Sequence, residues 1–347
     1  MRSPAQEALL RNRPLLRGRI ALLGPASDHL LPELPGGGLV MSEHAGVCAS
    51  LAAHSGWQVC FGYDDAALAR GGFDSVVVFL PKARAELDMR LALARWLAAA
   101  GARLILVGEK KEGIAGAVKQ LRAVVPQAAK ADSARHCQVW CADNLQSLPE
   151  FSVSQWLNWS RIECSGVAVD VAGLPGIFSQ GELDEGTRML LESFDTWPPA
   201  AGQRVLDFAC GAGVVGAWLQ AWQRRQGLPV ATVDGLDVQS QAVVCAGATY
   251  QQNDASGDIL ASDGLAGVDG VWPVIVSNPP FHTGVKTDTS MTEQFLRDAA
   301  RHLPRAGELR LVANRFLPYE SLMARCVGPV ERLLEDRRFT VYRAFRR

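Results

Sequence analysis

Residues 205–213 read VLDFACGAG, and residues 214–225 after them have the spacing of an amphipathic helix. An apolar strand that runs into small residues and then a helix is typical of a ligand-binding unit, because small residues let the backbone approach a ligand closely. The free amides at the start of the helix point at the same ligand. We therefore predict that this stretch is the first strand, turn and helix of a doubly wound α/β domain.

The rest of the chain repeats this alternation, which is typical of a mostly parallel sheet with helices on both faces. Early in the chain we expect a strand at residues 76–80, a helix at 85–100 and a strand at 103–107. In the C-terminal half we predict strands at 204–208, 229–236, 258–261, 272–277 and 308–313, helices at 214–225, 240–252 and 292–303, and a final pair of strands within 330–345.

The length and composition of the chain fit two domains, because 347 residues of which 48% are apolar can build two hydrophobic cores. Residues 148–176 differ in character: they hold isolated tryptophans and the pattern of a hairpin at 164–171. We interpret them as the joint. The prediction is an N-terminal domain at residues 1–150, a linker with a hairpin at 151–175 and a C-terminal domain at 176–347.

The net charge of −1 provides no overall basic field for nucleic acid. Residues 1–150 hold 17 Lys and Arg against 14 Asp and Glu, and the remainder holds 18 against 22, so the N-terminal part is the better candidate for contact with a polyanion. The eight cysteines form no CxxC pair, which argues against a metal site. The sequence contains no apolar run of about 18 residues, the length that a membrane span would need. Free thiols suit a reducing cytoplasm.

Acidic residues follow or end the predicted strands at positions that suit one ligand. Asp207 stands just before the glycine-rich turn, where a carboxylate can hold the ammonium group of a methionine moiety. A dinucleotide fingerprint with Gly216 as its third glycine is the competing interpretation, but a carboxylate is poorly placed beside a pyrophosphate. Asp237 can accept both ribose hydroxyls at the end of the second strand, and we prefer it to Asp234. Asp263 can accept the amine of an adenine, so the series indicates S-adenosylmethionine.

Residues 277–282 read SNPPFH directly after the apolar strand. Two consecutive prolines remove two backbone donors and fix an extended turn whose carbonyl groups point outward. The Asn278 side-chain oxygen and the Pro279 carbonyl can each accept one hydrogen of a planar NH2 group, and Phe281 offers a ring for stacking. The nitrogen lone pair would then face the methyl donor. We predict an amine-methylating site that works by positioning, without a strong general base.

This series of motifs resembles the amino-methylating class of Rossmann-like, S-adenosylmethionine-dependent methyltransferases. NPPFHTG at 278–284 and VANRFLPY at 312–319 are similar, more narrowly, to the family of small-subunit (16S) ribosomal RNA guanine-N2 methyltransferases, methyltransferase C. The segments LPGIFS at 174–179 and LDEG at 183–186 are also similar to that family, as is DSAR at 132–135, so the resemblance covers nearly the whole chain. It implies two tandem Rossmann-like domains, the first degenerate and the second catalytic, and methyl transfer to a guanine N2 in 16S rRNA.

The resemblance also implies roles for single residues. The cofactor-binding set is Asp207, Ala209, Gly211, Gly213, Asp237, Asp263 and Asn278. The catalytic set is Asn278, Pro279 and Phe281. The further residues that we predict to bind the substrate are Phe178, Pro280, His282 and Lys286. Ala209 departs from the family pattern, which usually has a glycine there, and an alanine costs little only if its φ is negative.

Other activities use the same motifs. A protein glutamine-N5 methyltransferase would need the same site because a carboxamide is also a planar NH2, although Phe281 followed by His282 argues gently against it. Adenine-N6 methylation is the next alternative, and the large-subunit rRNA guanine-N2 enzyme would have a nearly identical motif. A binding or assembly factor without activity is disfavoured by the intact residues 278–281.

The first domain is predicted to be a copy that has lost this chemistry. SVVVFLPK at 75–82 parallels PVIVSNPP at 273–280, with Leu80 where the second domain has Asn278, and no acidic residue precedes the turn that starts at Gly24. We expect this domain to bind no cofactor and to contact rRNA, within the small ribosomal subunit. The candidate phosphate-binding residues after its parallel strands are Lys82, Arg84, Lys110 and Lys111.

Overall fold

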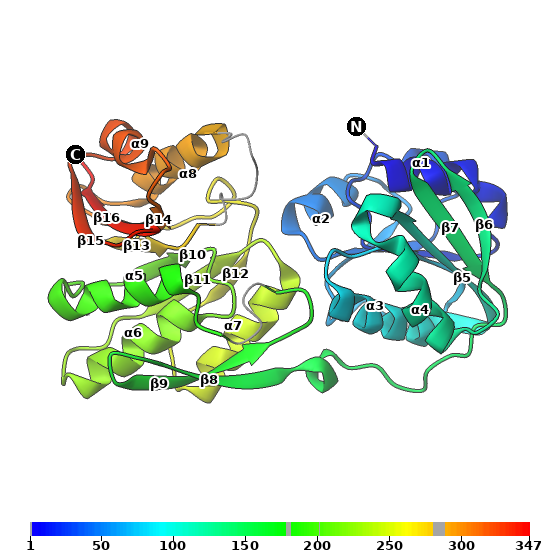
Figure 1. The fold of residues 1–347 in the computed structure, drawn as a ribbon, viewed down its shortest axis with the longest axis horizontal. Coiled ribbons are helices and arrows are strands. Elements are labelled where there is room, and N and C mark those ends of the chain that lie inside the picture. Colours follow the sequence, from blue (N-terminus) through cyan, green and yellow to red (C-terminus); the bar gives the residue numbers. More distant parts are fainter. Residues whose placement is uncertain (1, 178–181, 201, 280–288) are drawn as a thin grey trace. The chain divides into compact units, whose positions relative to one another are not determined.

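The computed structural model describes residues 2–177, 182–200, 202–279 and 289–347. The chain divides into two compact units, residues 1–157 and 158–347. Each unit contains a seven-stranded sheet with helices on both faces (Figure 1). The prediction of two tandem domains of this class is confirmed.

In the N-terminal unit the strand order is β3-β2-β1-β4-β5-β7-β6. The strands are β1 (Ile20–Leu23), β2 (Leu39–Ser42), β3 (Gln58–Phe61), β4 (Phe73–Phe79), β5 (Ala98–Glu109), β6 (Ala129–Ala134) and β7 (Cys137–Ala142). The helices are α1 (Pro4–Arg11), α2 (Ala45–Leu51), α3 (Arg84–Leu97) and α4 (Ile114–Val124).

In the C-terminal unit the strand order is β12-β11-β10-β13-β14-β16-β15. The strands of this sheet are β10 (Val205–Phe208), β11 (Val233–Asp237), β12 (Ile259–Ala261), β13 (Val274–Ser277), β14 (Glu308–Asn314), β15 (Val330–Glu335) and β16 (Phe339–Phe345). The helices are α5 (Glu185–Thr196), α6 (Val214–Arg225), α7 (Ser240–Gln252), α8 (Thr289–His302) and α9 (Tyr319–Cys326).

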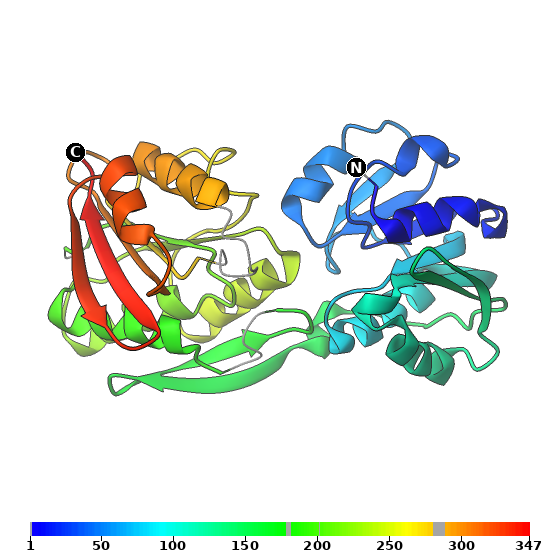
Figure 2. The ribbon, with the colours of Figure 1, turned by 45° about the horizontal axis from the view of Figure 1, so that its top comes forward.

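The two sheets have the same topology: five parallel strands, followed by an antiparallel pair at one edge (Figure 2). In β10, Leu206 and Phe208 face the core under α8 and α9, whereas Val205 faces the core under α5 and α6. This alternation is the period of two expected for a strand that is buried on both faces. The same side of the sheet that carries the α6 packing also carries Asp207, the one polar residue of this strand.

The predicted elements are close to the observed ones where the apolar pattern is strong. Helices α6 and α7 have the predicted bounds, and the strand predicted at 229–236 pairs with β10 only from Val233 onward. The helix predicted at 85–100 ends at Leu97, where β5 begins directly. Helices α5 and α9 were not predicted.

A two-stranded hairpin of β8 (Asn158–Cys164) and β9 (Val167–Gly173) packs on α6 and α7. Its backbone is bonded to both helices: Trp218 Nε1 donates to the Cys164 carbonyl (3.1 Å), and the Ala172 amide donates to Thr249 Oγ1 (3.0 Å). The hairpin lies in the range that we assigned to a linker, and here it is part of the C-terminal unit. Residues 151–156 pack instead on the core of the N-terminal unit.

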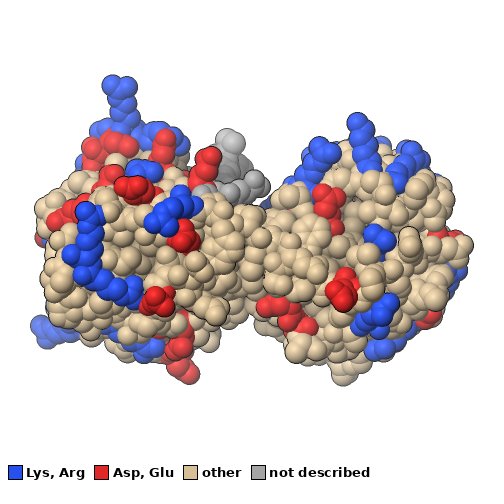
Figure 3. All heavy atoms as spheres, turned by 90° about the horizontal axis from the view of Figure 1, so that it is seen from below, with Lys and Arg blue, Asp and Glu red and all other residues tan. Residues whose placement is uncertain are grey.

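On the face drawn in Figure 3, Lys and Arg side chains alternate with Asp and Glu side chains over both units. Three arginines among the first seventeen residues have acidic partners: Arg2 pairs with Glu33, Arg11 with Asp132 and Arg17 with Asp143. No helix in the described part of the chain is both long and apolar enough to span a membrane.

Candidate active site

Four neighbouring strands of the C-terminal sheet end at the same edge, and the predicted binding residues stand at their ends. The strands lie in the order β12, β11, β10, β13 and are all parallel. Asp263 follows β12, Asp237 ends β11, the glycine-rich turn follows β10 and Asn278 follows β13. Along this edge the residues predicted to hold adenine, ribose, methionine and the target base therefore come in that order.

Asp207 is a buried carboxylate, with 1% of the residue exposed. No described residue donates a hydrogen bond to its Oδ2 atom. Burial raises the pKa of the Asp207 carboxyl well above its ordinary value, and the negative charge of Asp237 raises it further. An unsatisfied buried carboxylate oxygen is costly, so this position fits a cationic or hydrogen-donating ligand group.

The turn between β10 and α6 has three residues in the left-handed region: Ala209 (φ +58°), Gly211 (φ +54°) and Gly213 (φ +77°). We expected an alanine at position 209 to cost little only if its φ were negative. The observed φ of Ala209 is positive, so this condition is not met. The Gly211 amide donates to Asp237 Oδ2 (2.9 Å), which ties the turn to the end of β11. A Cβ on Gly211 would meet open space, so the backbone there is open to a ligand.

Asp237 and Asp234 have different surroundings. Asp234 is buried within the sheet, where it accepts hydrogen bonds from the Asp258 amide (3.0 Å) and Trp272 Nε1 (2.7 Å) and pairs with Arg204 (2.7 Å). Asp237 is half-buried at the carboxyl end of β11. This difference supports Asp237 as the ribose-binding carboxylate and gives Asp234 a structural task.

Asp263 is exposed after the short strand β12. The Ser262 amide before it donates to the Asp237 carbonyl (3.0 Å), and Ser262 Oγ donates to the Gly264 carbonyl (2.8 Å). These bonds fix the turn that carries Asp263 beside the end of β11.

Asn278 is half-buried and Pro279 is buried directly after β13. Ser277 Oγ donates to the Phe208 carbonyl (2.8 Å), which fixes the end of β13 against β10. The other predicted substrate-binding and catalytic residues lie outside the described residues: Phe178, Pro280, Phe281, His282 and Lys286.

Two residues that contact Asn278 were not predicted from the sequence. Asn278 Nδ2 donates to Asp184 Oδ2 and to Thr187 Oγ1, at 2.9 Å each. Both acceptors belong to the start of α5, more than ninety residues earlier in the chain. The only signal in the sequence was the segment LDEG at 183–186, which we used as a family marker and not as part of the site.

Taken together, these residues fit S-adenosylmethionine. The unsatisfied Asp207 oxygen suits the ammonium group, the left-handed turn offers open backbone beside it, and Asp237 lies one strand further along. Gly216 does not belong to a dinucleotide site, because a Cβ there would lie 1.7 Å from the Tyr250 hydroxyl oxygen. Its small size serves the packing of α6 against α7.

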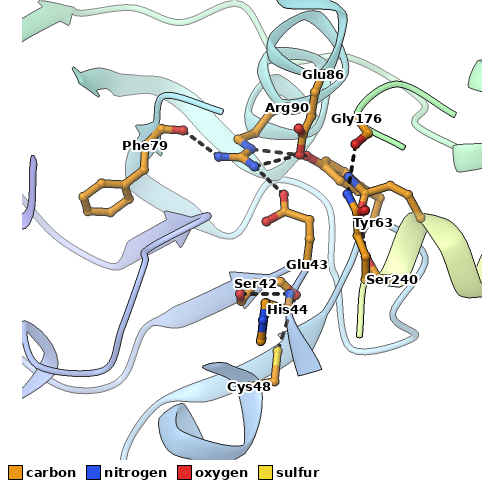
Figure 4. Close-up of polar contacts among 12 residues, drawn as sticks. Ser42, Glu43, His44, Cys48, Tyr63, Phe79, Glu86, Arg90, Gly176 and Ser240 are labelled. Atoms are coloured by element: carbon orange, nitrogen blue, oxygen red, sulfur yellow. Dashed lines mark hydrogen bonds and ion pairs between the residues drawn. The ribbon is translucent and has the colours of Figure 1, made fainter. Parts of the chain in front are cut away.

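The corresponding edge of the N-terminal unit is filled by Arg90 of α3 (Figure 4). The guanidinium donates to the Phe79 carbonyl (2.6 Å) and pairs with Glu43 (2.6 Å) and Glu86 (2.9 Å). It also lies against the backbone after β1, where a Cβ on Gly24 would be 2.1 Å from Arg90 Nη1. Burial alone would lower the pKa of Arg90, but the neighbouring acidic groups outweigh it and raise the pKa.

The strand registers correct our alignment of the two units. Leu23 ends β1 and pairs with Val78, whereas Phe208 ends β10 and pairs with Ser277. The residue that matches Asn278 is therefore Phe79 and not Leu80. The slip of one residue arose because the two apolar runs are similar at either register, and only the partner strands fix which side chain faces which core.

Comparisons with known proteins define the class. Residues 168–343 match the family model described as the methyltransferase small domain, and residues 6–159 match that of its N-terminal domain. With the edge of four strand ends described above, the chain is a Rossmann-like methyltransferase of the class that uses S-adenosylmethionine.

Relatives of known name define the family. The chain is 41% identical to ribosomal RNA small subunit methyltransferase C of Hahella chejuensis and 42% identical to that of Pseudomonas paraeruginosa, with 99% of each chain covered in both cases. A solved 16S rRNA guanine-N2 methyltransferase of T. thermophilus, in complex with AdoMet and guanosine, is similar over 100% of this chain and 92% of its own, with a TM-score of 0.85 at 26% identity. The chain belongs to the ribosomal RNA small subunit methyltransferase C family.

Proposed function

We propose that this protein transfers a methyl group from S-adenosylmethionine to the exocyclic N2 of a guanine in 16S rRNA. Its full-length relatives carry the name of the small-subunit enzyme, and the T. thermophilus enzyme was solved with AdoMet and guanosine. The observation that supports this most directly is the half-buried Asn278, whose side-chain oxygen could accept an amine hydrogen, directly after β13. The neighbouring strand β10 carries Asp207, whose Oδ2 atom has no hydrogen-bond partner among the described residues.

The cofactor, when bound, supplies an electrophilic methyl group on a sulfonium. Asp207 and the turn at 209–213 would hold its methionine end, Asp237 its ribose and Asp263 its adenine. Asn278 Oδ1 and the Pro279 carbonyl would accept the two hydrogens of the guanine amine, so that its lone pair is free to react. Phe281 would stack on the base, and Phe178, Pro280, His282 and Lys286 would complete the substrate site.

This mechanism needs no strong general base, because the amine loses its proton only after the new C–N bond has formed. The contribution of the chain in this proposal is to orient the reacting nitrogen toward the methyl group. Guanine N2 lies in the minor groove of a helix, so the target base has to leave its pair before it can enter the site.

We infer that the N-terminal unit does not bind the cofactor. Arg90 occupies the edge at β1 and β4, Leu22 stands at the place of Asp207 in the first strand, and Phe79 stands at the place of Asn278. The unit instead contacts rRNA in this proposal. Lys82, Arg84 and Lys110 are exposed after the parallel strands β4 and β5, and the exposed Lys111 pairs with Glu109 (3.0 Å).

We propose that the partner is 16S rRNA within the small ribosomal subunit, and that the enzyme works in the cytoplasm. The T. thermophilus relative is described as acting on guanine 1207 of 16S rRNA, and we propose the equivalent nucleotide as the target here. Mapping of methylguanines in both ribosomal RNAs, from cells with and without the gene, tests this. We expect one N2-methylguanine of 16S rRNA to disappear in the deletion strain; loss of a 23S rRNA methylguanine alone would overturn the proposal.

A further inference from the structure

The side-chain amide of Asn278 has one orientation set by its neighbours. An amide NH2 group carries two hydrogens, and those of Asn278 meet two acceptors, Asp184 Oδ2 and Thr187 Oγ1, both at 2.9 Å. In this arrangement both amide hydrogens of Asn278 are already bonded to acceptors within the protein. The side-chain group left to bind a ligand is the carbonyl oxygen Oδ1, which can only accept.

Asp184 is itself held in place by the helix that it caps. It is the N-cap of α5, and its Oδ2 accepts from the Thr187 amide (3.0 Å) as well as from Asn278. Gly186 lies beside this contact and leaves room for it, because a Cβ there would lie 3.1 Å from Asp184 Oδ2, tighter than an ordinary van der Waals contact. The first turn of α5 thus forms a cradle for one face of the Asn278 amide.

The far end of α5 is anchored to the sheet by Arg310, a fully buried residue of β14. Its guanidinium donates to Ser193 Oγ (3.0 Å) and to the Trp197 carbonyl (2.7 Å), and it pairs with Glu308 (2.7 Å). A cation at the carboxyl end of a helix is favourable, and this one also fixes the helix relative to β14, the neighbour of β13. The position of Asp184 relative to Asn278 therefore rests on buried contacts.

The negative charge of Asp184 has two consequences for the amide. A carboxylate behind the NH2 group polarises the amide, so the Oδ1 atom becomes a better acceptor. A flipped amide would place Oδ1 against the Asp184 carboxylate, which is repulsive. Both effects favour a substrate that presents hydrogens, such as an NH2 group, over one that presents a carbonyl oxygen.

We propose that Asp184 and Thr187 are positioning residues for methyl transfer: they orient the Asn278 amide so that its oxygen faces the amine of the substrate. The proposal rests on the function proposed above and adds to it two residues that act on the substrate through Asn278. It makes the first turn of α5 a determinant of amine selectivity.

Two substitutions separate this role from a purely structural one. Thr187→Val removes the hydroxyl but keeps the side-chain shape and the backbone amide that the cap uses. Asp184→Ser removes the charged acceptor but keeps an N-cap, because serine caps helices about as well as aspartate. Thr187→Ser keeps a hydroxyl that can accept the hydrogen bond from Asn278. Thr196→Val makes the same change as Thr187→Val at an exposed position in the last turn of α5 and is the matched control.

The experiment measures single-turnover methylation of small ribosomal subunits that lack the modification, with calorimetric S-adenosylmethionine affinity and the thermal midpoint of each variant. We expect Thr187→Val to lower the rate about tenfold, and Asp184→Ser by about tenfold to a hundredfold, from the loss of neutral and charged hydrogen bonds. Cofactor affinity should stay at the wild-type value, and the thermal midpoint should fall by no more than about 2–4 °C, so that the fold stays intact at the assay temperature. Thr187→Ser and Thr196→Val should methylate within about twofold of wild type.

Rates of Thr187→Val and Asp184→Ser equal to wild type would overturn the positioning role. A loss of rate that follows an equal loss of cofactor affinity or thermal stability would also overturn it, since the residues would then act through the fold. Mass spectrometry of the wild-type product tests the proposed function separately. A methylated product other than N2-methylguanine would count against the function and not against the orientation of Asn278.

Discussion

Asp207, which we propose to bind the ammonium group of the cofactor, lowers the stability of the cofactor-free protein. Its pKa is raised by burial and by Asp237, so the folded protein without cofactor binds this proton more tightly than the unfolded chain does. The stabilising contribution of Asp207 is therefore fully present at pH values below its pKa in the unfolded chain. It is lost as the pH rises toward the higher pKa of Asp207 in the folded protein. At pH values above the unfolded pKa, Asp207 therefore lowers the stability of the cofactor-free fold, because folding must either take up a proton or bury a charge.

We predict that Asp207→Asn raises the thermal midpoint of the cofactor-free protein, with a gain that grows as pH increases from about 5 to about 8. The same substitution should weaken S-adenosylmethionine binding, because the ammonium group loses its carboxylate. For the wild type, affinity should fall as pH drops below the raised pKa of Asp207. Thermal scans and calorimetry across this pH range check both; parallel pH profiles for wild type and variant would contradict the role of Asp207.

Asp237 and Asp234 give a second prediction, as two acidic residues of one strand with separate tasks. Asp237→Ala should weaken S-adenosylmethionine binding by roughly 1–3 kcal/mol, the value of lost hydrogen bonds to a charged group. Asp234→Asn should leave the affinity of the folded protein unchanged but lower its thermal midpoint, because Arg204 and Trp272 lose a charged partner. Unchanged affinity of Asp237→Ala in calorimetry would move the ribose-binding role elsewhere.

The turn between β10 and α6 carries strain at Ala209. A left-handed φ costs an L-residue roughly 1–2 kcal/mol, and a glycine avoids this cost but gains freedom in the unfolded chain. Ala209→Gly should therefore raise the free energy of unfolding, by up to about 1 kcal/mol, with cofactor affinity retained. Ala212→Gly, in the same turn without a positive φ, is the control and should destabilise. A lower stability of Ala209→Gly in urea denaturation would show that the turn holds no such strain.

Elements and site residues were predictable from the sequence to different extents. The glycine-rich turn and the strands around it have strong local patterns, so β10, α6 and α7 were predicted closely, and Asp207, Asp237 and Asn278 could be assigned to strand ends. The cradle of Asp184 and Thr187 could not be predicted, because it joins residues more than ninety positions apart and no local pattern encodes that contact. The register of β4 against β1 was also beyond sequence comparison, since apolar runs align equally well after a slip of one residue.

The molecule as a whole has two units of the same topology, and the difference between them lies in the polar groups at the strand ends. In the N-terminal unit the buried Arg90 satisfies Glu43 and Glu86. In the C-terminal unit the buried Asp207 has an oxygen that no described residue satisfies. The charges in the first unit are thus paired internally, whereas the second unit keeps a buried carboxylate oxygen that a bound ligand could satisfy.

This contrast predicts that the full-length protein binds one S-adenosylmethionine per chain. Calorimetric titration measures the number of S-adenosylmethionine molecules bound per chain. In Asp237→Ala, a variant of the C-terminal unit, the affinity of all the bound cofactor should fall. Arg90→Ala should not create a second site, because Leu22 and Phe79 still lack the polar groups that binding needs. Two cofactors per chain, or a signal that persists unchanged in Asp237→Ala, would contradict the assignment of the units.

We propose that the end of β13 orients an amine of the substrate toward a cofactor held by the ends of β10, β11 and β12. The most direct test is Asn278→Ala, assayed for methyl transfer to guanine N2 of 16S rRNA in small ribosomal subunits and for S-adenosylmethionine affinity in the same preparation. We predict that the transfer rate falls by at least about a hundredfold while cofactor affinity stays nearly unchanged, because we assign Asn278 to the substrate amine and not, as the resemblance implied, to the cofactor as well. A variant that keeps more than about a tenth of the wild-type rate, or that loses rate and cofactor affinity together, would contradict this account.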